Sequence, residues 1–507
     1  MYLKNYLKIY YWKLISVFSG FLSMVLVVPN ISDDSVLYGI YMFIMSISLY
    51  LSYADIGFLS AGQKYSAEYF ANNDIKNEKG VMGFVFMLMI IVFLPFIALM
   101  LVFTFDPYIA FKELEDSGAR VASKLFLIMG LLFPLQILLQ RIMSMILAIR
   151  LLDYISTRFE IVTNIIKILS IFYFFGNGKY MLIEYFLFCT LLTIFCYLIV
   201  GVVIKYKINY NFIELFKTFS LSSKYFYKTK DLALSSFVAT FSFILFYEID
   251  LILIGKFIGS YELAIYAIAF TFLNFLRSLW VIIYTPIASR INHFVGLKQL
   301  NKLYETLEIL VKFTLPLYFF GVFVLLINTQ KLILLWVGEY YLSANFILQL
   351  LLISVFFNYI IQPASQYFYA CTKYKYIFIN ASILPVVFFA SIYFFYDNYG
   401  VLSFAIGKLL AIISSFFVCC FALSKITSTT KISLRWILPL VLSSCLIYFC
   451  NKFFVELLFP SPEKDLLNLV LFLIYLSLTF VISYLTMILL FKENRIFLYE
   501  QYKRLLK

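Results

Sequence analysis

Seven charged residues lie inside long apolar stretches of this sequence, where a charge needs a chemical reason. They are Asp55, Arg141, Lys167, Glu248, Asp250, Arg277 and Lys408. Arg141, Lys167 and Arg277 lie nearest the middle of their stretches, and no acidic residue shares that depth. A charge at the centre of an apolar layer costs roughly 2.5–3.5 kcal/mol on insertion scales. We therefore expect these three bases to face a watery cavity and to receive an anion.

Polar and aromatic residues accompany these bases at helical spacing. Asn274, Trp280 and Tyr284 share a helix face with Arg277, and a second polar stripe without a charge includes Gln362. Such residues either bind a ligand or hold neighbouring helices together by hydrogen bonds. The predicted substrate-binding set is Arg141, Lys167, Arg277, Lys408, Asn274, Trp280, Tyr284 and Gln362.

The three acidic residues lie nearer the ends of their stretches. Acids in transporter helices often carry coupling protons or cations, so Asp55, Glu248 and Asp250 are candidates for ion coupling. An interfacial structural role explains them equally well. Glu248 and Asp250 are two residues apart and face different ways on a helix, so they do not form a dyad.

The composition places these residues in a membrane protein. The chain has 507 residues, of which 64% are hydrophobic and 13% charged, and its mean hydropathy is +0.95. Soluble proteins are about 45–50% apolar and about 25% charged. Apolar runs of about 20 residues, each long enough for one membrane-spanning helix, recur along the whole length. The predicted fold class is an all-α polytopic membrane protein.

Fourteen spans fit the sequence, and twelve is the next alternative. The predicted spans are 13–31, 36–60, 81–105, 122–149, 159–176, 181–204, 232–255, 263–289, 310–328, 344–370, 376–396, 400–424, 436–455 and 466–491. With the N-terminus in the cytoplasm, most Lys and Arg residues fall in cytoplasmic segments, among them 61–80, 150–158 and 205–231. We therefore expect both termini in the cytoplasm.

Two pairs of segments suggest that the chain repeats itself. "SVLYGIY" (35–41) is similar to "SYELAIY" (260–266), and "SIFYFFGN" (170–177) to "SIYFFYDN" (391–398). We predict two six-helix lobes, 1–210 and 211–430, followed by two extra spans and a cytoplasmic tail in 431–507. Transporters built from such repeats bind their substrate between the lobes, near mid-depth.

Other classes of function find little support. The net charge of +13 comes from basic residues between the spans, which set topology, so we expect no nucleic-acid partner. All seven cysteines lie in apolar runs and the chain has one histidine, so we predict no metal site. No predicted loop is long enough for a soluble catalytic domain. We expect neither an enzyme nor a cofactor.

Three segments resemble a known family. "LYGIYMFIMSISLYLSYADIGFLSAGQKYSAEYF" (37–70), "YEIDLILIGKFIGSYELAIYAIA" (247–269) and "IIQPASQYFYACTKYKY" (360–376) are similar to the second, seventh and tenth spans of bacterial polysaccharide-exporter flippases. The chain therefore resembles an O-antigen flippase of the multidrug/oligosaccharidyl-lipid/polysaccharide (MOP) exporter superfamily.

The resemblance implies a function. It implies a flippase in the bacterial cytoplasmic (inner) membrane that moves undecaprenyl-pyrophosphate-linked oligosaccharide, an O-antigen or capsule repeat unit, to the periplasmic leaflet. Membrane lipids, and other glycan-assembly membrane proteins, are the expected partners. One alternative is an ion-coupled drug/cation antiporter of the same superfamily, which would require acids at mid-depth. The other is a membrane polysaccharide polymerase, which usually carries a large catalytic periplasmic loop.

Overall fold

The computed structural model is all-helical over the residues that it describes: 2–52, 57–111, 114–150, 152–176, 178–296, 298–371, 373–425, 434–459 and 465–490. Asp55 lies outside these residues. The chain forms two compact units, Met1–Ala267 and Ile268–Lys507. The predicted division into lobes at residue 210 stays a prediction.

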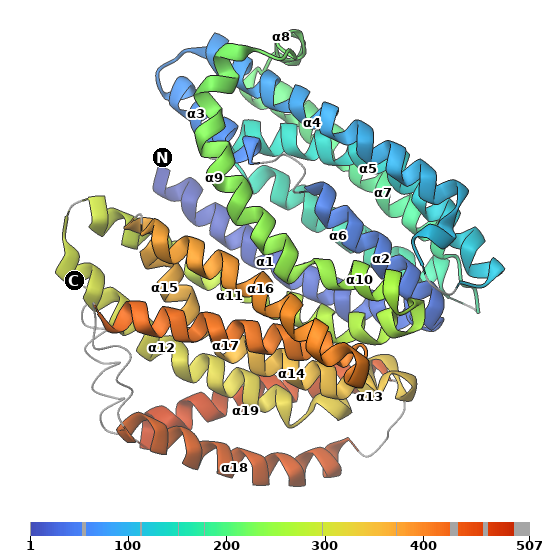
Figure 1. Ribbon diagram of the computed structural model, residues 1–507, viewed down its shortest axis with the longest axis vertical. Coiled ribbons are helices and arrows are strands. Elements are labelled where there is room, and N and C mark those ends of the chain that lie inside the picture. The colour runs from blue at the N-terminus through green and yellow to red at the C-terminus, as the bar shows by residue number, and fades with distance from the viewer. Residues whose placement is uncertain are drawn as a thin grey trace. The chain divides into compact units, whose positions relative to one another are not determined.

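The first unit contains α1 to α10 and the beginning of α11 (Figure 1). Its helices are α1 (Tyr2–Ile31), α2 (Ser35–Ser52), α3 (Phe58–Ala71), α4 (Ile75–Phe105), η1 (Pro107–Ile109), α5 (Asp116–Ile149), α6 (Tyr154–Phe174), α7 (Leu182–Ile208), α8 (Phe212–Lys217), α9 (Ser223–Tyr247), α10 (Ile249–Phe257) and α11 (Ser260–Gly296). Within it, α5 packs against both α4 and α7, and α1 packs against α6.

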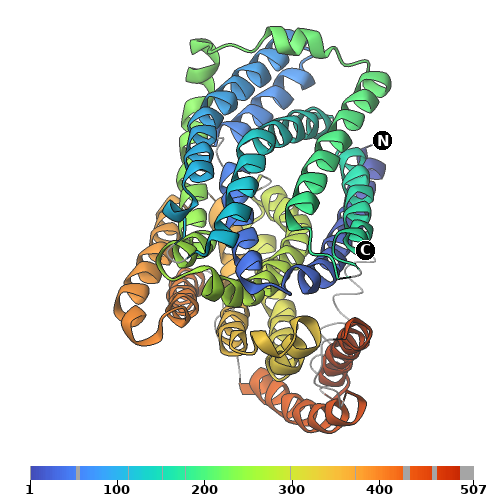
Figure 2. The same cartoon turned by 90° about the vertical axis from the view of Figure 1, so that its right-hand side faces the viewer.

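The second unit contains the rest of α11 and the remaining helices. They are α12 (Leu300–Leu326), α13 (Thr329–Val337), η2 (Glu339–Tyr341), α14 (Ala344–Phe356), α15 (Asn358–Ala370), α16 (Tyr374–Tyr399), α17 (Leu402–Ser424), α18 (Leu434–Leu458) and α19 (Leu466–Leu490). The closest packing is between α16 and α17. The last two helices, α18 and α19, lie side by side at the margin of this unit in both views (Figures 1 and 2).

The predicted fold class is confirmed. Over the described residues, thirteen of the fourteen predicted spans coincide with one helix or with a helix broken once, and the span 36–60 contains α2 and the beginning of α3. Among the described residues, nine helices are individually long and apolar enough to cross a membrane, and the bent pair α14–α15 makes a tenth. The helices also continue beyond the apolar runs: α3 occupies much of the segment 61–80, which we predicted as a cytoplasmic loop. Gly57, in the left-handed conformation at φ 76°, allows the chain to turn before α3.

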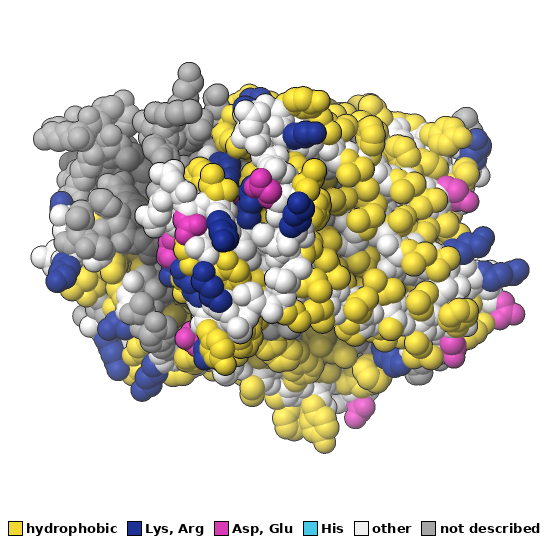
Figure 3. All heavy atoms as spheres, turned by 90° about the horizontal axis from the view of Figure 1, so that it is seen from above, with side chains coloured by type: hydrophobic (Ala, Val, Ile, Leu, Met, Phe, Trp, Pro, Cys, Tyr) yellow, Lys and Arg dark blue, Asp and Glu magenta, His cyan; other side chains and the backbone are white. Residues whose placement is uncertain are grey.

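The apolar exterior of the first unit fits a lipid environment. On the side that carries α4, α5 and α8, apolar side chains form a broad band, and Lys and Arg gather over α8 and the neighbouring helix ends (Figure 3). Leu94 and Leu99 of α4 and Leu131 of α5 belong to the exposed apolar residues. A contiguous apolar surface of this kind is stable in lipid and promotes association in water.

Besides the span 36–60, two predicted spans are interrupted within the described residues. Glu248 separates α9 from α10. A 46° bend separates α14 from α15 at Phe357, six residues before Pro363. Pro363 has no backbone N–H to donate to the carbonyl of Tyr359, and the Thr314 hydroxyl lies 3.5 Å from that carbonyl. The single hydrogen of that hydroxyl points to the Leu310 carbonyl of its own helix at 2.8 Å, so Thr314 makes at most a weak contact with the Tyr359 carbonyl.

Close helix approach depends on Gly39 in the first unit. A Cβ added to Gly39 of α2 would lie 2.0 Å from the backbone oxygen of Ser260, at the start of α11. Only a glycine allows the two backbones to approach this closely. In the second unit a reciprocal amide pair joins Asn328 to Asn451 of α18, both at 3.0 Å, and the Tyr475 hydroxyl of α19 donates to Asn451 at 3.2 Å. These bonds attach α18 and α19 to their unit.

Candidate functional site

A polar chamber of about 310 Å³ lies inside the first unit, and Lys167 is the charged residue in its lining. Five helices form it: α1, α2, α5, α6 and α7. The lining consists of Ser23, Val27, Tyr41, Met45, Ser48, Phe133, Gln136, Ile137, Gln140, Asn164, Lys167, Tyr185, Phe186, Cys189, Thr190 and Thr193. We call this space the Lys167 chamber. Lys167 therefore lies against a cavity, and its role in substrate binding stays a prediction.

The ammonium group of Lys167 is not neutralised by a neighbouring acid. Among the residues that the structure describes, no carboxylate forms an ion pair with Lys167, and its amine donates no hydrogen bond. Glu160, two turns earlier on α6, accepts a hydrogen bond from Tyr197 at 2.5 Å. The one acid on the same polar stripe thus has a different partner, and the positive charge of Lys167 faces the chamber.

Arg141 lies on α5, one residue beyond Gln140 of the chamber lining. The lining of the Lys167 chamber does not include Arg141 among the described residues, and its side chain is partly buried. The two bases of the first unit therefore do not share this cavity. The substrate-binding role of Arg141 stays a prediction.

The residues predicted around Arg277 lie together on α11. The Arg277 guanidinium donates to the side-chain oxygen of Asn274 at 2.8 Å. The Trp280 indole stacks on Tyr318 of α12, with ring centroids 3.7 Å apart and planes at 17°. Tyr284 is buried on the same helix. The polar face predicted from helical spacing is therefore formed, whereas its contact with a substrate stays a prediction.

Lys408 and Gln362 occupy different surroundings in the second unit. Lys408 is 1% exposed on α17, and its amine lies 5.2 Å from the ring centre of Phe270 and 5.5 Å from that of Phe388. Aromatic faces attract a cation, so these rings partly replace the lost hydration of the amine. Gln362 is partly buried on α15, just before Pro363.

The candidate ion-coupling acids Glu248 and Asp250 lie at the break between α9 and α10. Both are buried, and the Tyr266 hydroxyl of α11 donates a hydrogen bond to the Asp250 carboxylate. A helix break exposes backbone polar groups and is a common place for ions to bind in transporters. The geometry is compatible with a coupling role, and that role stays a prediction.

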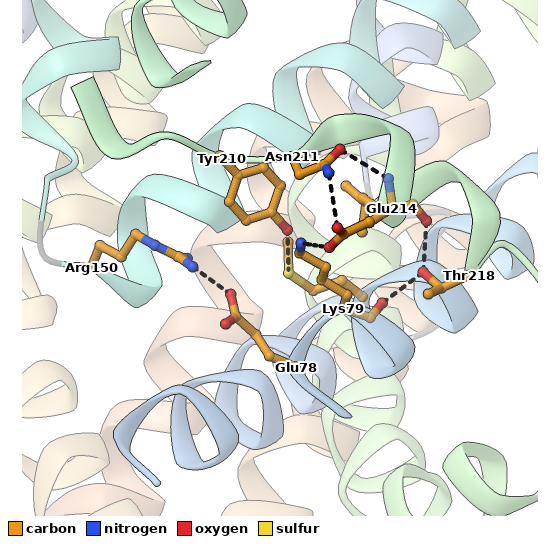
Figure 4. A network of polar contacts seen from close by, with 9 residues as sticks. Glu78, Lys79, Arg150, Tyr210, Asn211, Glu214 and Thr218 are labelled. Carbon is orange, nitrogen blue, oxygen red and sulfur yellow. Dashed lines mark hydrogen bonds and ion pairs between the residues drawn. The ribbon is translucent and has the colours of Figure 1, made fainter. Parts of the chain in front are cut away.

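A second group of charges, which sequence reasoning did not single out, lies where three predicted cytoplasmic segments meet. Glu78 and Lys79 begin α4, Arg150 ends α5 and Glu214 lies on α8. Arg150 pairs with Glu78 at 2.8 Å and Lys79 pairs with Glu214 at 2.5 Å (Figure 4). We call these four residues the paired cluster. Each base in it has an acidic partner.

Further contacts hold the paired cluster in place. Arg150 and Lys79 lie 5.1 and 5.2 Å from the ring centre of Tyr210, and the Thr218 hydroxyl donates to the Lys79 carbonyl at 2.9 Å. A Cβ on Gly83 would lie 2.2 Å from the Thr218 hydroxyl oxygen, so this glycine permits the close approach. The ammonium of Lys79, through a hydrogen bond and its charge, holds the pKa of the Glu214 carboxyl below its usual range.

The sequence signal for the paired cluster was present but not specific. Its four residues lie in the segments 61–80, 150–158 and 205–231, where basic residues were explained as topology determinants. The sequence does not specify which of the many loop charges face one another. The available sequence signal was the position of two acids close to predicted spans. Glu78 shortly precedes the span 81–105, and Glu214 follows the span 181–204.

Comparison with known proteins supports the superfamily. The MatE family model matches residues 235–394. No curated protein sequence matches the chain. The match extends over the end of α9 to α16, which includes the two helix breaks and the candidate acids Glu248 and Asp250.

Solved structures of the superfamily have the same fold. The chain is similar to the lipid II flippase MurJ in an inward closed conformation, with a TM-score of 0.67, 16% identity and 100% of each chain covered. It is also similar to a multidrug resistance MATE family transporter of the MOP superfamily. The inward-facing form has a TM-score of 0.59 and 12% identity, covering 84% of this chain and 96% of that one. The outward-facing form has a TM-score of 0.56 and 14% identity, covering 85% and 97%. The fold is that of solved MOP-superfamily transporters, and it agrees with the resemblance to this superfamily predicted from sequence.

Proposed function

We propose that this protein is a flippase for undecaprenyl-pyrophosphate-linked oligosaccharide and moves it from the cytoplasmic to the periplasmic leaflet. The observation that carries the proposal is the ammonium of Lys167, which faces a polar chamber without an acidic partner among the described residues. A base that is not neutralised by the protein favours an anionic substrate over a cationic drug. The likeness to a lipid II flippase over the whole chain supports a lipid-linked cargo.

The proposed mechanism is alternating access. The sugar-pyrophosphate head group enters from the cytoplasmic side and binds the basic residues Arg141, Lys167 and Arg277, while the prenyl tail stays in lipid. The lobes then rock to expose the head group to the periplasm. A membrane potential that is negative inside favours the export of an anion by roughly 2.3 kcal/mol per charge per 100 mV. We also propose that the protein lies in the bacterial inner membrane with both termini in the cytoplasm.

Other residues have supporting parts in this proposal. Asn274, Trp280, Tyr284 and Gln362 would bind sugar hydroxyls or stack on sugar faces, since aromatic rings offer an apolar face with a polar edge. Lys408 would contribute its charge if its aromatic neighbours moved. Asp55, Glu248 and Asp250 are proposed as coupling groups for a proton or cation.

Transport in liposomes tests the proposed function. The purified full chain is reconstituted in liposomes with a fluorescently labelled prenyl-pyrophosphate glycan. A lectin that binds only glycan in the outer leaflet measures how much of it has been moved from one leaflet to the other. We expect Arg277→Gln to slow flipping by about ten-fold, because a charge-assisted hydrogen bond contributes about 1.5–3 kcal/mol. Lys205→Gln, an exposed lysine near the end of α7, is the matched control. A wild-type protein that carries no such glycan would contradict the proposal.

The MatE match also favours a second candidate, an ion-coupled drug/cation antiporter. Its binding groups would be the buried acids Glu248 and Asp250. The same liposomes, loaded with a cationic dye under an imposed proton or sodium gradient, distinguish the two. Dye exchange driven by the gradient, without glycan transport, would favour the antiporter. Glycan polymerised by the purified protein would favour a membrane polysaccharide polymerase.

A further inference from the structure

The Lys167 chamber presents one cationic donor and several hydrogen-bond acceptors. Lys167 supplies the donor from α6. Thr190 and Thr193 of α7 also line the chamber, and their hydroxyl hydrogens go to the backbone carbonyls of Phe186 and Cys189 at 2.8 and 2.7 Å. Because those hydrogens are engaged, the two hydroxyl oxygens can serve the chamber only as acceptors.

Gln136 adds a further acceptor to the chamber. Its side chain belongs to the lining, and its Oε1 is buried and receives no hydrogen bond from any described protein group. An orphaned buried carbonyl oxygen costs about 1–3 kcal/mol. The last side-chain torsion of glutamine is soft, so a small rotation presents this oxygen to a ligand. Lys167 and Gln136 are thus two groups in one cavity that a single ligand would satisfy together.

The lining also offers flat apolar faces. Phe133 and Phe186 stack on each other at 5.5 Å with their planes at 11°, and the Tyr41 ring meets Phe186 edge-on at 6.2 Å. All three rings belong to the lining. Aromatic rings beside hydroxyl and amide groups suit a ligand with an apolar face and a polar edge.

These features together define one class of ligand. The ligand must bring a negative charge for Lys167, several donors for the threonine and glutamine oxygens, and a face that packs on aromatic rings. We propose that the Lys167 chamber binds an acidic sugar residue, a hydroxylated ring that carries a single carboxylate. The chamber's volume of about 310 Å³ lies at the lower end of small-molecule sites, about 300–1,000 Å³, which suits one sugar residue.

The alternatives fit the lining less well. A pyrophosphate could accept from Lys167 and from the amide and phenol donors of the lining, but it brings no donor for the threonine oxygens, and the charge of its two phosphates exceeds that of the single ammonium. A phosphate monoester carries about −1.5 to −2 and has the same mismatch. A cationic drug would supply donors but would be repelled by Lys167. A carboxylate matches the ammonium charge for charge.

This inference rests on the proposed function and makes it more specific. In this more specific form, Arg141 and Arg277 bind the pyrophosphate. Lys167 binds an acidic sugar in the attached glycan. Such a protein transports glycans that contain a uronic-acid type of residue faster than neutral glycans of the same length. Lys167, Gln136 and Thr190 are then specificity-determining residues.

Binding of small sugars to the purified full chain tests the chamber without requiring transport. Glucuronate, glucose and acetate are titrated by calorimetry: glucuronate has charge and hydroxyls, glucose only hydroxyls, and acetate only charge. We expect glucuronate to bind at least about ten-fold more tightly than either, the effect of one charge-assisted hydrogen bond. Lys167→Gln should lose this preference, Lys167→Arg should keep most of it, and Lys205→Gln should keep all of it. Glucuronate binding no tighter than glucose or acetate in the wild type would overturn the proposal.

Transport of two matched glycans separates this inference from the proposed function. Both are prenyl-pyrophosphate oligosaccharides of equal length, one with a uronic-acid residue and one with its neutral counterpart. We expect the wild type to prefer the acidic glycan, and Lys167→Gln to slow its flipping by about ten-fold with less than about two-fold effect on the neutral one. If both glycans are flipped equally by wild type and variant, the chamber inference fails and the flippase stands. If the wild type flips neither, the flippase fails, and the sugar titrations decide the chamber.

Discussion

The paired cluster and the Lys167 chamber both remove charges from water within the same unit, and they do so in opposite ways. In the paired cluster, Glu78 is 0% exposed and has Arg150 at 2.8 Å, and Lys79 has Glu214 at 2.5 Å. In the chamber, Lys167 has no acidic partner among the described residues. Paired charges hold elements together because breaking a pair leaves an uncompensated charge. An unpaired charge beside a cavity does not stabilise the fold. We therefore propose that Lys167 binds a ligand.

The two regions also differ in which elements they join. The paired cluster connects α4, the end of α5 and α8, three places that lie far apart in the sequence. The chamber lies inside the helix packing, where five helices each contribute part of the lining. If the contrast is correct, substitutions in the first region act on stability, and substitutions in the second act on binding.

The largest effect should follow from Arg150→Met. This change leaves the buried carboxylate of Glu78 without its counter-ion, which typically costs about 3–5 kcal/mol. We expect a clear fall in the melting temperature of the protein in detergent, measured by the loss of monodisperse protein after heating. The double variant Glu78→Leu with Arg150→Met removes both charges and should recover most of that fall. A single variant as stable as the wild type would show that the ion pair does not hold the cluster.

A smaller loss should follow from Gly83→Ala. A Cβ there would lie 2.2 Å from the Thr218 hydroxyl oxygen and 2.5 Å from its backbone oxygen, so the segment between α8 and α9 must move away from α4. Overpacking of this kind costs about 1–3 kcal/mol. Gly20→Ala on α1 is the matched control, because a Cβ at that position meets no atom within 4 Å. We expect the control to melt at or slightly above the wild-type temperature, since alanine favours a helix over glycine. Equal effects of the two variants would contradict the close packing.

Lys167→Met should separate the two regions most sharply, because its effect on stability should be absent or opposite in sign. Removing a charge from mid-depth relieves a cost of roughly 2.5–3.5 kcal/mol at most. We therefore expect a melting temperature equal to or above that of the wild type, measured by the same heating assay, together with slower flipping of the acidic glycan. A destabilisation as large as that of Arg150→Met would mean that Lys167 has a structural partner and would weaken its assignment to a ligand.

The smallest effect should be the pH dependence carried by Glu214, which is 58% exposed. The charge of Lys79 and its hydrogen bond hold the pKa of this carboxyl below its usual range in the folded protein. A depressed pKa contributes stability that is fully present above the unfolded pKa, about 4.3, and is lost as the pH falls through the lower folded pKa. We expect the difference in melting temperature between wild type and Glu214→Gln to be small at pH 7, to shrink as the pH falls below about 4.3, and to vanish once the pH is below the lower folded pKa. A difference that stays constant across this range would contradict the assignment.

The sequence specified the spans of this protein because span formation is a local property. Inside lipid every backbone group must be satisfied within its own segment, so an apolar run of about 20 residues is sufficient to specify a helix. Over the described residues, the predicted spans accordingly coincide with helices, some of them broken. Helical spacing also placed Asn274 beside Arg277, since residues three apart share a face.

Only the tertiary structure decided which side chains meet. The pairing of Glu78 with Arg150 joins residues 72 positions apart, and that of Lys79 with Glu214 joins residues 135 apart. The sequence marked Lys167 as a base without an acid at its depth, whereas the lining of its chamber depends on how α1, α2, α5, α6 and α7 pack. Composition and spacing describe one helix at a time, and a binding site is made from the contacts between several.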